Sequence, residues 1–279
     1  MIHFALSDFF FNENIINYFS YIDTNYLKRK DISFYCAIGN FPFCYWNGGF
    51  NNNIDTSVVY TDILDKITNT SIPIRFNCNN VYLTQEDFED TFANLILSLG
   101  ENASNSISIS NFKLLKFLQE RYPNYKYVFS KEANLIEKFT PEIVNTILNN
   151  ENFLYFQIPE ELGQNLDFLK QIDKKEKIEV PINYICNKDC NRYNMCLRHE
   201  HQAQYNFSGY NNFFHCAKTN GLNSTIIPFD QITQYEKIGI THFYLNPVVD
   251  KNKEKSLLFL IDYFIKDEYK IKVLEEFEG

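Results

Sequence analysis

The fold is decided by three successive stretches: Ile72-Pro-Ile-Arg-Phe-Asn77, then Thr84-Gln-Glu-Asp87, then Ser106-Ile-Ser-Ile-Ser110. The first is an apolar strand pattern, with its proline near the start, where a missing ladder donor is tolerated. Thr84 and the acidic residues after it are typical of a helix start, and we expect a helix from Phe88 to Leu99. The alternation in the third stretch predicts another strand. Strand, helix and strand therefore follow one another here.

The same order recurs along the whole chain. The predicted strands are Ile2–Leu6, Ile32–Ile38, Ile72–Asn77, Ser106–Ser110, Lys126–Ser130, Phe153–Gln157, Ile178–Asn183 and Gly239–Asn246. Predicted helices separate most of them, at Asn12–Lys30, Val58–Ile67, Phe88–Leu99, Lys113–Arg121, Ile143–Leu148, Leu162–Ile172 and Pro228–Lys237, and Ser256–Ile265 follows the last strand. Eight strands alternating with helices favour a closed parallel barrel over an open doubly wound sheet.

We therefore predict an α/β protein built as a single (β/α)8 TIM-type barrel over residues 1–279, a length that suits one such domain. Residues 184–227 are predicted to form a long cysteine-rich, metal-binding loop after the seventh strand. The net charge of −9 argues against nucleic acid as a partner drawn by bulk charge. The sequence shows neither an export signal nor a run long enough to span a membrane, so we expect a cytoplasmic protein with reduced thiols.

The cysteine-rich stretch reads Cys186-Asn-Lys-Asp-Cys190-Asn-Arg-Tyr-Asn-Met-Cys196-Leu-Arg-His199-Glu-His201, and Cys216 follows it. Clustered thiols in a chain without a secretory signal are typical of metal ligands rather than disulfides. The spacing matches neither a paired zinc knuckle nor a ferredoxin run. It is compatible with an iron–sulfur cluster of the 4Fe-4S type or with a zinc site that uses cysteine and histidine, in which His199 or His201 replaces Cys196. We favour iron–sulfur, because a long loop at a barrel mouth suits an exposed cluster.

In a β/α barrel, residues at the carboxyl ends of the strands form the active site. The predicted catalytic residues are Arg75, Asn77 and Asp8, and the predicted substrate-binding residues are Trp46, Asn47, Gln157, Asn183 and Asn246. Arg75 stands between two apolar residues, where a guanidinium is costly to bury unless it is paired or binds an anion. A structural partner, such as Asp8 or a helix carboxyl group, is the alternative. Trp46 either covers a ligand or plugs the barrel mouth.

Three segments follow the cysteine-rich stretch: Ile227-Pro-Phe-Asp230, Tyr235 and Gly239-Ile-Thr-His-Phe243. Together with that stretch they resemble the peptidase U32-like barrels, a family that includes collagenase-like peptidases and iron–sulfur hydroxylases of RNA bases and quinone precursors. The three segments look like the family's helix start at proline and aspartate, its tyrosine, and the glycine before its last barrel strand. The resemblance covers about the last third of the chain at the level of motifs.

The resemblance implies an iron–sulfur cluster and a ligand set. The implied ligands are Cys186, Cys190, Cys196 and Cys216. The chain departs from the family at Tyr244-Leu-Asn-Pro247, where the family has a basic–acidic–glycine–arginine ending, so we expect a different substrate group to be contacted there. The cysteine spacing also differs from the usual one.

Three functional hypotheses remain open at this stage. The first is a metalloenzyme that performs hydroxylation or a related oxygen insertion on a small or nucleotide-like substrate. The second is a zinc-dependent peptidase or other hydrolase, with Asp8 or Glu200 as the base. The third is a non-catalytic barrel with a structural metal site. The sequence does not indicate an oligomeric state.

Overall fold

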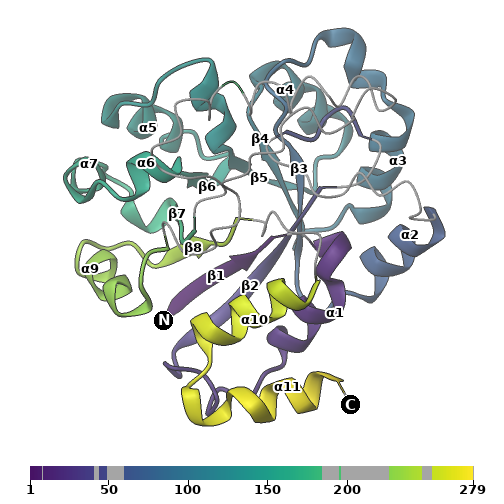
Figure 1. Cartoon of the computed structure of the whole chain (residues 1–279). Coiled ribbons are helices and arrows are strands. Elements are labelled where there is room, and N and C mark those ends of the chain that lie inside the picture. Colours follow the sequence, from purple (N-terminus) through teal and green to yellow (C-terminus); the bar gives the residue numbers. More distant parts are fainter. Residues whose placement is uncertain are drawn as a thin grey trace.

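The computed structural model describes residues 1–7, 9–40, 44–48, 60–183, 195, 226–246 and 253–278. Eight parallel strands close into a barrel, paired in chain order from the first to the eighth (Figure 1). They are β1 Ile2–Leu6, β2 Ile32–Gly39, β3 Ile74–Cys78, β4 Ser106–Ile109, β5 Lys126–Phe129, β6 Phe153–Gln157, β7 Ile178–Pro181 and β8 His242–Tyr244. The predicted (β/α)8 TIM-type barrel is therefore confirmed. Nearly all of the predicted loop 184–227 lies outside the described residues.

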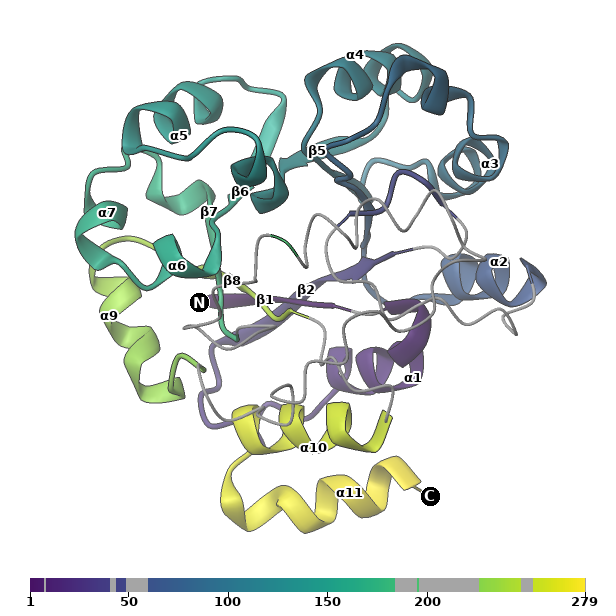
Figure 2. The same ribbon diagram turned by 45° about the horizontal axis from the view of Figure 1, so that its top comes forward.

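Helices surround the strands (Figure 2). They are α1 Phe9–Ser20, α2 Tyr60–Asn69, α3 Thr91–Gly100, α4 Phe112–Arg121, α5 Pro141–Leu148, α6 Glu160–Gly163, α7 Leu166–Lys170, α9 Ile232–Lys237, α10 Lys253–Phe264 and α11 Lys270–Glu278. Short 3-10 turns include Gln85–Glu89 and Lys131–Leu135. None of the helices in the described ranges combines the length and apolar character that crossing a membrane requires.

Local signals explain where the helices begin. Thr140 caps α5, its side chain accepting a hydrogen bond from the Ile143 amide, and Pro141 is the first helical residue, as predicted. Thr84 caps the short turn Gln85–Glu89 through Asp87 instead of opening the longer helix. That longer helix, α3, begins after Asp90, whose carboxylate accepts from the amide of Ala93 at 2.7 Å. The predicted helix Phe88–Leu99 was thus placed correctly, but its cap was assigned six residues too early.

The apolar core fills the space between the strands and the helices. Phe4 of β1 and Phe34 of β2 pack edge to face against Phe264 of α10, with ring centroids 4.8 and 5.0 Å apart. Alternate strand residues point the other way, into the barrel, and many of these are polar or charged. The barrel interior is therefore unusual, since branched apolar side chains dominate the interior of most TIM barrels.

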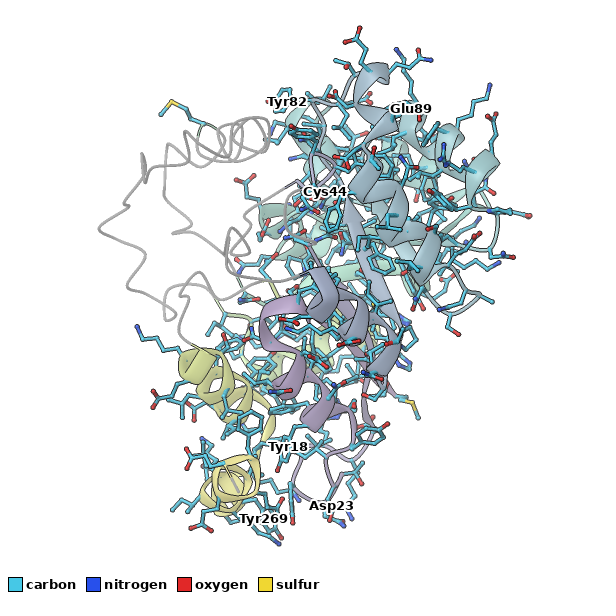
Figure 3. All side chains as sticks on the ribbon, turned by 90° about the vertical axis from the view of Figure 1, so that its right-hand side faces the viewer. Tyr18, Asp23, Cys44, Tyr82, Glu89 and Tyr269 are labelled. Carbon is cyan, nitrogen blue, oxygen red and sulfur yellow. The ribbon has the colours of Figure 1, made fainter. Side chains whose placement is uncertain are left out.

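Helix α11 was missed by the sequence analysis, although Val273, Leu274 and Phe277 have helical spacing. It runs beside α10 and packs on the end of α1 (Figure 1). The ring of Tyr18 meets that of Phe277 edge to face at 5.6 Å, and its hydroxyl donates to Glu276. Figure 3 shows Tyr18 on the side of the molecule where α11 lies, and Cys44 far from it. The carboxyl-terminal helix thus closes against the first helix.

The glycine of the segment Gly239-Ile-Thr-His-Phe243 is explained by its backbone conformation. Gly239, which precedes β8, has φ of 94°, a left-handed conformation that side chains with a Cβ rarely adopt. Its amide donates to the Glu236 carbonyl as α9 ends. The glycine that the sequence analysis singled out before the last strand is therefore required by the turn itself.

Candidate functional site

The amino-terminal half of the barrel interior contains a fully buried ion pair. Arg75 is the second residue of β3 and Glu179 the second of β7, and together they span the barrel. The Arg75 guanidinium donates to both oxygens of the Glu179 carboxylate, at 2.6 and 2.7 Å. The Tyr35 hydroxyl donates to the same carboxylate and accepts from Arg75 at 3.3 Å. We call these three residues the amino-end network.

Two histidines lie beside this network. His3 of β1 pairs in register with His242 of β8, so their rings stack with centroids 4.6 Å apart. The ring of Tyr155 lies 4.6 Å from that of His242. Burial lowers the pKa of His242 to about 4 and also lowers the pKa of His3, so the surroundings favour the neutral form of each ring. Both histidines therefore belong to the barrel interior, beside the amino-end network.

A second buried ion pair lies at the other end, where the strands finish, which we call the carboxyl mouth. Lys131 follows β5 and Glu160 begins α6 after β6. The Lys131 ammonium donates to Glu160 at 2.5 Å and to the side-chain oxygen of Asn246, just after β8, at 2.6 Å. The Asn246 amide in turn donates to Glu160 at 3.0 Å. Because strands and loops from three sectors of the barrel supply these groups, closure of the barrel brings them together.

Asn183 ties this cluster to the cysteine-rich stretch. Its side chain accepts from the Asn246 backbone amide at 2.7 Å and donates to the Asn246 carbonyl at 3.1 Å. Asn183 also forms an antiparallel bridge with Ile226, and the Ile227 amide donates to the Ile182 carbonyl at 2.8 Å. The chain therefore enters and leaves the segment 184–225 at one point of the carboxyl mouth. We call Lys131, Glu160, Asn183 and Asn246 the mouth cluster.

A carboxyl group with an altered pKa adjoins the mouth cluster. Glu132 is buried, and its carboxylate accepts hydrogen bonds from the Ser130 hydroxyl and, at 3.0 Å, from the Asn79 amide. Burial raises the pKa of Glu132, while Lys131 next to it opposes that rise. Gln157, at the end of β6, accepts from the Ser108 hydroxyl at 3.3 Å. This carboxyl group has the property of a proton-transferring residue, namely a pKa moved toward neutrality.

The predicted site residues divide between the two ends of the barrel. Arg75 is three residues before the end of β3 and belongs to the amino-end network, where it is paired with Glu179. Asn77 faces the carboxyl half, and its amide donates to the Asn40 side chain at 2.7 Å. Gln157, Asn183 and Asn246 all lie at the carboxyl mouth, as expected. The catalytic and substrate-binding roles remain predictions.

Trp46 and Asn47 are completely buried. The indole N–H of Trp46 donates to the Asp87 carbonyl at 2.7 Å, and its ring meets that of Phe117 edge to face. The amide of Gly48 donates to the Asn79 side chain at 2.8 Å, which connects this loop to Glu132. The tryptophan therefore anchors its loop in the core, and the loop holds Asn79 in place.

The remaining predicted residues lie outside the described part of the chain. They are Asp8, the cysteines Cys186, Cys190, Cys196 and Cys216, and the alternative ligands His199 and His201. Within the described ranges, no group of three histidine, cysteine or acidic side chains is placed to hold a metal ion. Cys36, Cys44 and Cys78 are buried, and burial raises the pKa of each thiol. These three cysteines are core residues.

Four charged residues of the barrel interior and mouth were not predicted from the sequence: Lys131, Glu132, Glu160 and Glu179. The first two were detectable, because Ser130-Lys131-Glu132 comes directly after a predicted strand and two adjacent charges there fall on the catalytic edge. Glu160 was harder to find, since Glu160 and Glu161 begin a helix, where acidic residues are common on exposed surfaces. For Glu179, the local sequence pattern alone does not distinguish a buried strand residue from an exposed one.

The fold and the polar carboxyl mouth together define the class of protein: a β/α barrel with its candidate active site where the strands end. No protein-family model and no curated protein sequence matches the chain. Among solved structures, the barrel is similar to that of the U32 peptidase Mk0906, with a TM-score of 0.56 and 10% sequence identity over 88% of this chain and 93% of that chain. At this identity the similarity shows a shared fold, and at that level it confirms the U32-like barrel predicted from the sequence.

Proposed function

We propose that the chain is a metalloenzyme that transforms a small or nucleotide-like substrate at the carboxyl mouth of the barrel. The observation that carries the proposal is the buried pair of Lys131 and Glu160, joined by Asn246. Removing two charges from water is costly, and hydrophobic residues of similar size often serve stability as well or better. A buried ion pair at the end where barrel enzymes carry out chemistry therefore supports a functional role.

The metal part of the proposal rests on the chemistry of the donor set. Four cysteines in the segment 184–225 offer thiolates suited to a 4Fe-4S cluster, with Cys186, Cys190, Cys196 and Cys216 as its ligands. The described residues that flank this segment, Asn183 and Ile226, form a β-bridge at the mouth cluster. Such a cluster would supply redox chemistry for hydroxylation. The protein's described residues would bind and orient the substrate, and Glu132 would hold a proton.

A zinc-dependent hydrolase is the second candidate, and Glu132 favours it. A buried carboxyl group with a raised pKa is suited to hold and release the proton that hydrolysis moves, and a zinc ion bound nearby would supply the activation of water. The structural neighbour is described as a peptidase, which agrees with hydrolysis. In this case a mixed set of cysteines with His199 or His201 would bind the zinc.

Metal analysis of protein purified without oxygen separates the two candidates. We expect brown protein with iron and inorganic sulfide for the first, and colourless protein with one zinc per chain for the second. Cys190→Ser should abolish binding of the metal, whereas Cys36→Ala, which removes a buried thiol of the barrel, should leave the metal content unchanged. Absence of both metals from the native chain would overturn the metalloenzyme proposal.

The role of the mouth is tested by turnover with a mixed panel of quenched peptides and of nucleosides with a reductant and oxygen. We expect Glu132→Gln to lower kcat by about 100-fold or more, the usual contribution of a proton-transferring group. Glu137→Gln, an exposed carboxylate five residues further on, is the matched control and should retain full activity. Full activity of Glu132→Gln would remove Glu132 from the mechanism.

A further inference from the structure

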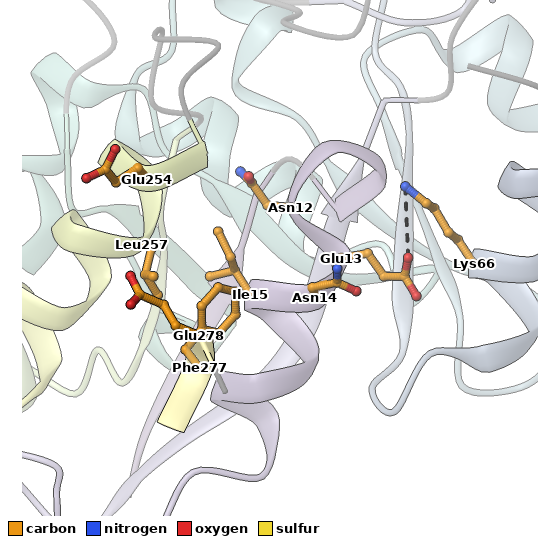
Figure 4. A pocket seen from close by; sticks show the side chains of 9 residues that line it. All are labelled: Asn12, Glu13, Asn14, Ile15, Lys66, Glu254, Leu257, Phe277 and Glu278. Carbon is orange, nitrogen blue, oxygen red and sulfur yellow. Dashed lines mark ion pairs between the residues drawn. The ribbon is translucent and has the colours of Figure 1, made fainter. Parts of the chain in front are cut away.

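A pocket with a volume of about 290 Å³ lies outside the barrel, between α1, α10 and α11 (Figure 4). Its walls are formed by Asn12 and Ile15 of α1, Glu254 and Leu257 of α10, and Phe277 and Glu278 of α11. On one side it extends to Glu13 and Lys66, whose charged atoms are 3.9 Å apart. This volume is at the lower end of the range for small-molecule sites, roughly 300–1,000 Å³. The pocket shares no residue with the mouth cluster.

The polar group at the inner wall is the side chain of Asn12. The backbone of α1 leaves helical angles at this residue, with φ of −116° and ψ of 27°. Asn12 is 7% exposed, and within the described part of the chain its side-chain oxygen has no hydrogen-bond partner. A buried amide oxygen without a partner is costly in the folded state. The Asn12 side-chain oxygen at the pocket wall is therefore a polar atom that a ligand with an N–H donor can satisfy.

The charged side chains around the pocket favour a positively charged ligand. Among the described residues, the pocket is lined by Glu13, Glu254 and Glu278 and by one cation, Lys66. The Lys66 ammonium is held between Glu13 and the Phe10 carbonyl, to which it donates at 2.7 Å. An anion would meet an excess of carboxylates. A bare metal ion is disfavoured as well, since in the described ranges no three acidic, histidine or cysteine side chains converge on one point.

The rest of the lining is apolar. Ile15 and Leu257 are buried, and Phe277 packs its ring against Tyr18. Burying a hydrocarbon or aromatic group here removes apolar surface from water on both sides. We propose that this pocket binds a small primary ammonium compound with an apolar body, its charged group between Asn12 and the carboxylates and its body against Ile15, Leu257 and Phe277. This site is separate from the proposed function at the carboxyl mouth and does not depend on it.

Calorimetric titration of the full chain tests the proposal, with 2-phenylethylammonium chloride as the probe. We expect a dissociation constant of about 1 mM, as for a small ligand held by few groups. The neutral 2-phenylethanol has the same apolar body and should bind several-fold more weakly, whereas 3-phenylpropionate should not bind. Equal affinity for the ammonium compound and the alcohol, or no binding of the ammonium compound at about 20 mM, would overturn the proposal.

Variants locate the binding. Glu254→Gln/Glu278→Gln removes two exposed carboxylates and should raise the dissociation constant by about 10-fold, from a few-fold for each charge. The control Glu275→Gln changes an exposed carboxylate of α11 that does not line the pocket, and it should leave the dissociation constant unchanged. Asn12→Leu should weaken binding while raising the melting temperature, because it removes a buried amide oxygen that has no hydrogen-bond partner. Unaltered binding in the double glutamine variant would show that the probe binds elsewhere.

Discussion

The two ends of the barrel interior each contain a buried ion pair, but the surroundings of the pairs differ. At the amino end, Arg75 binds both oxygens of Glu179, and Tyr35 completes the contact. At the carboxyl mouth, Lys131 and Glu160 share Asn246. The amino-end network is a bidentate pair, the geometry that best offsets the cost of burial. The mouth cluster stands where the strands end and where segment 184–225 is anchored.

The difference between the two ion pairs shows that burial of a charge does not by itself identify a functional site. Arg75 was the first choice from sequence as a catalytic residue, yet its guanidinium is occupied by a carboxylate deep in the barrel. Glu132 was not noticed, yet it is the carboxyl group near the strand ends whose pKa burial raises. We interpret the amino-end network as structural support and the mouth as the place of chemistry.

The largest expected effect comes from breaking the amino-end network. Glu179→Leu leaves the Arg75 guanidinium buried without its partner, which should lower the free energy of unfolding by about 4 kcal/mol. Urea denaturation monitored by circular dichroism measures it. The double variant Arg75→Leu/Glu179→Leu should recover most of the loss, because neither charge remains. A double variant as unstable as the single one would contradict the structural interpretation of this pair.

An intermediate effect is expected from His242 and depends on pH. The folded pKa of about 4 lies below the usual 6.5, so the unfolded chain binds the proton more readily than the folded chain. Stability is therefore retained above pH 6.5 and lost as the pH falls toward 4, by up to about 3 kcal/mol. The neighbouring charges act in opposite directions, Glu179 raising this pKa and His3 and Arg75 lowering it.

Denaturation midpoints of the native chain and of His242→Gln between pH 4 and 7 measure this effect. We expect a shallower decline with acid in the variant, since glutamine does not titrate. Parallel curves for the two proteins would show that His242 is not protonated preferentially in the unfolded state. For Glu132 at the carboxyl mouth, the same pH series should show the opposite dependence, because a raised carboxyl pKa makes stability fall as the pH rises.

The smallest expected effect is that of Glu132→Gln on stability. Burial raises the pKa of this carboxyl group, so its ionised form is disfavoured in the folded chain and stability decreases as the pH rises through the carboxyl range. Glutamine removes the charge and should raise the free energy of unfolding at pH 7 by about 1 kcal/mol, as functional-site substitutions often do. Thermal denaturation at pH 7 measures it, and a clear loss of stability would make Glu132 a structural residue like Glu179.

Much of the fold followed from local patterns. Alternating apolar strands and amphipathic helices predicted the eight-stranded barrel, and Thr140-Pro141 predicted the start of α5. The positions of Gln157, Asn183 and Asn246 at the carboxyl mouth followed from the rule that strand ends share one face. These features depend on residues close together in the chain, which is why a single sequence contains them.

The ion-pair partners were decided only by the tertiary structure. Arg75 and Glu179 are 104 residues apart, and Lys131 and Asn246 are 115 residues apart. Such pairs form because the closed barrel sets the strand order and register, and with them the distance across its interior. Local residue patterns set which segments become strands and which polar residues lie at their ends. Closure of the sheet determined which charges meet, because contact across a barrel depends on all eight strands at once.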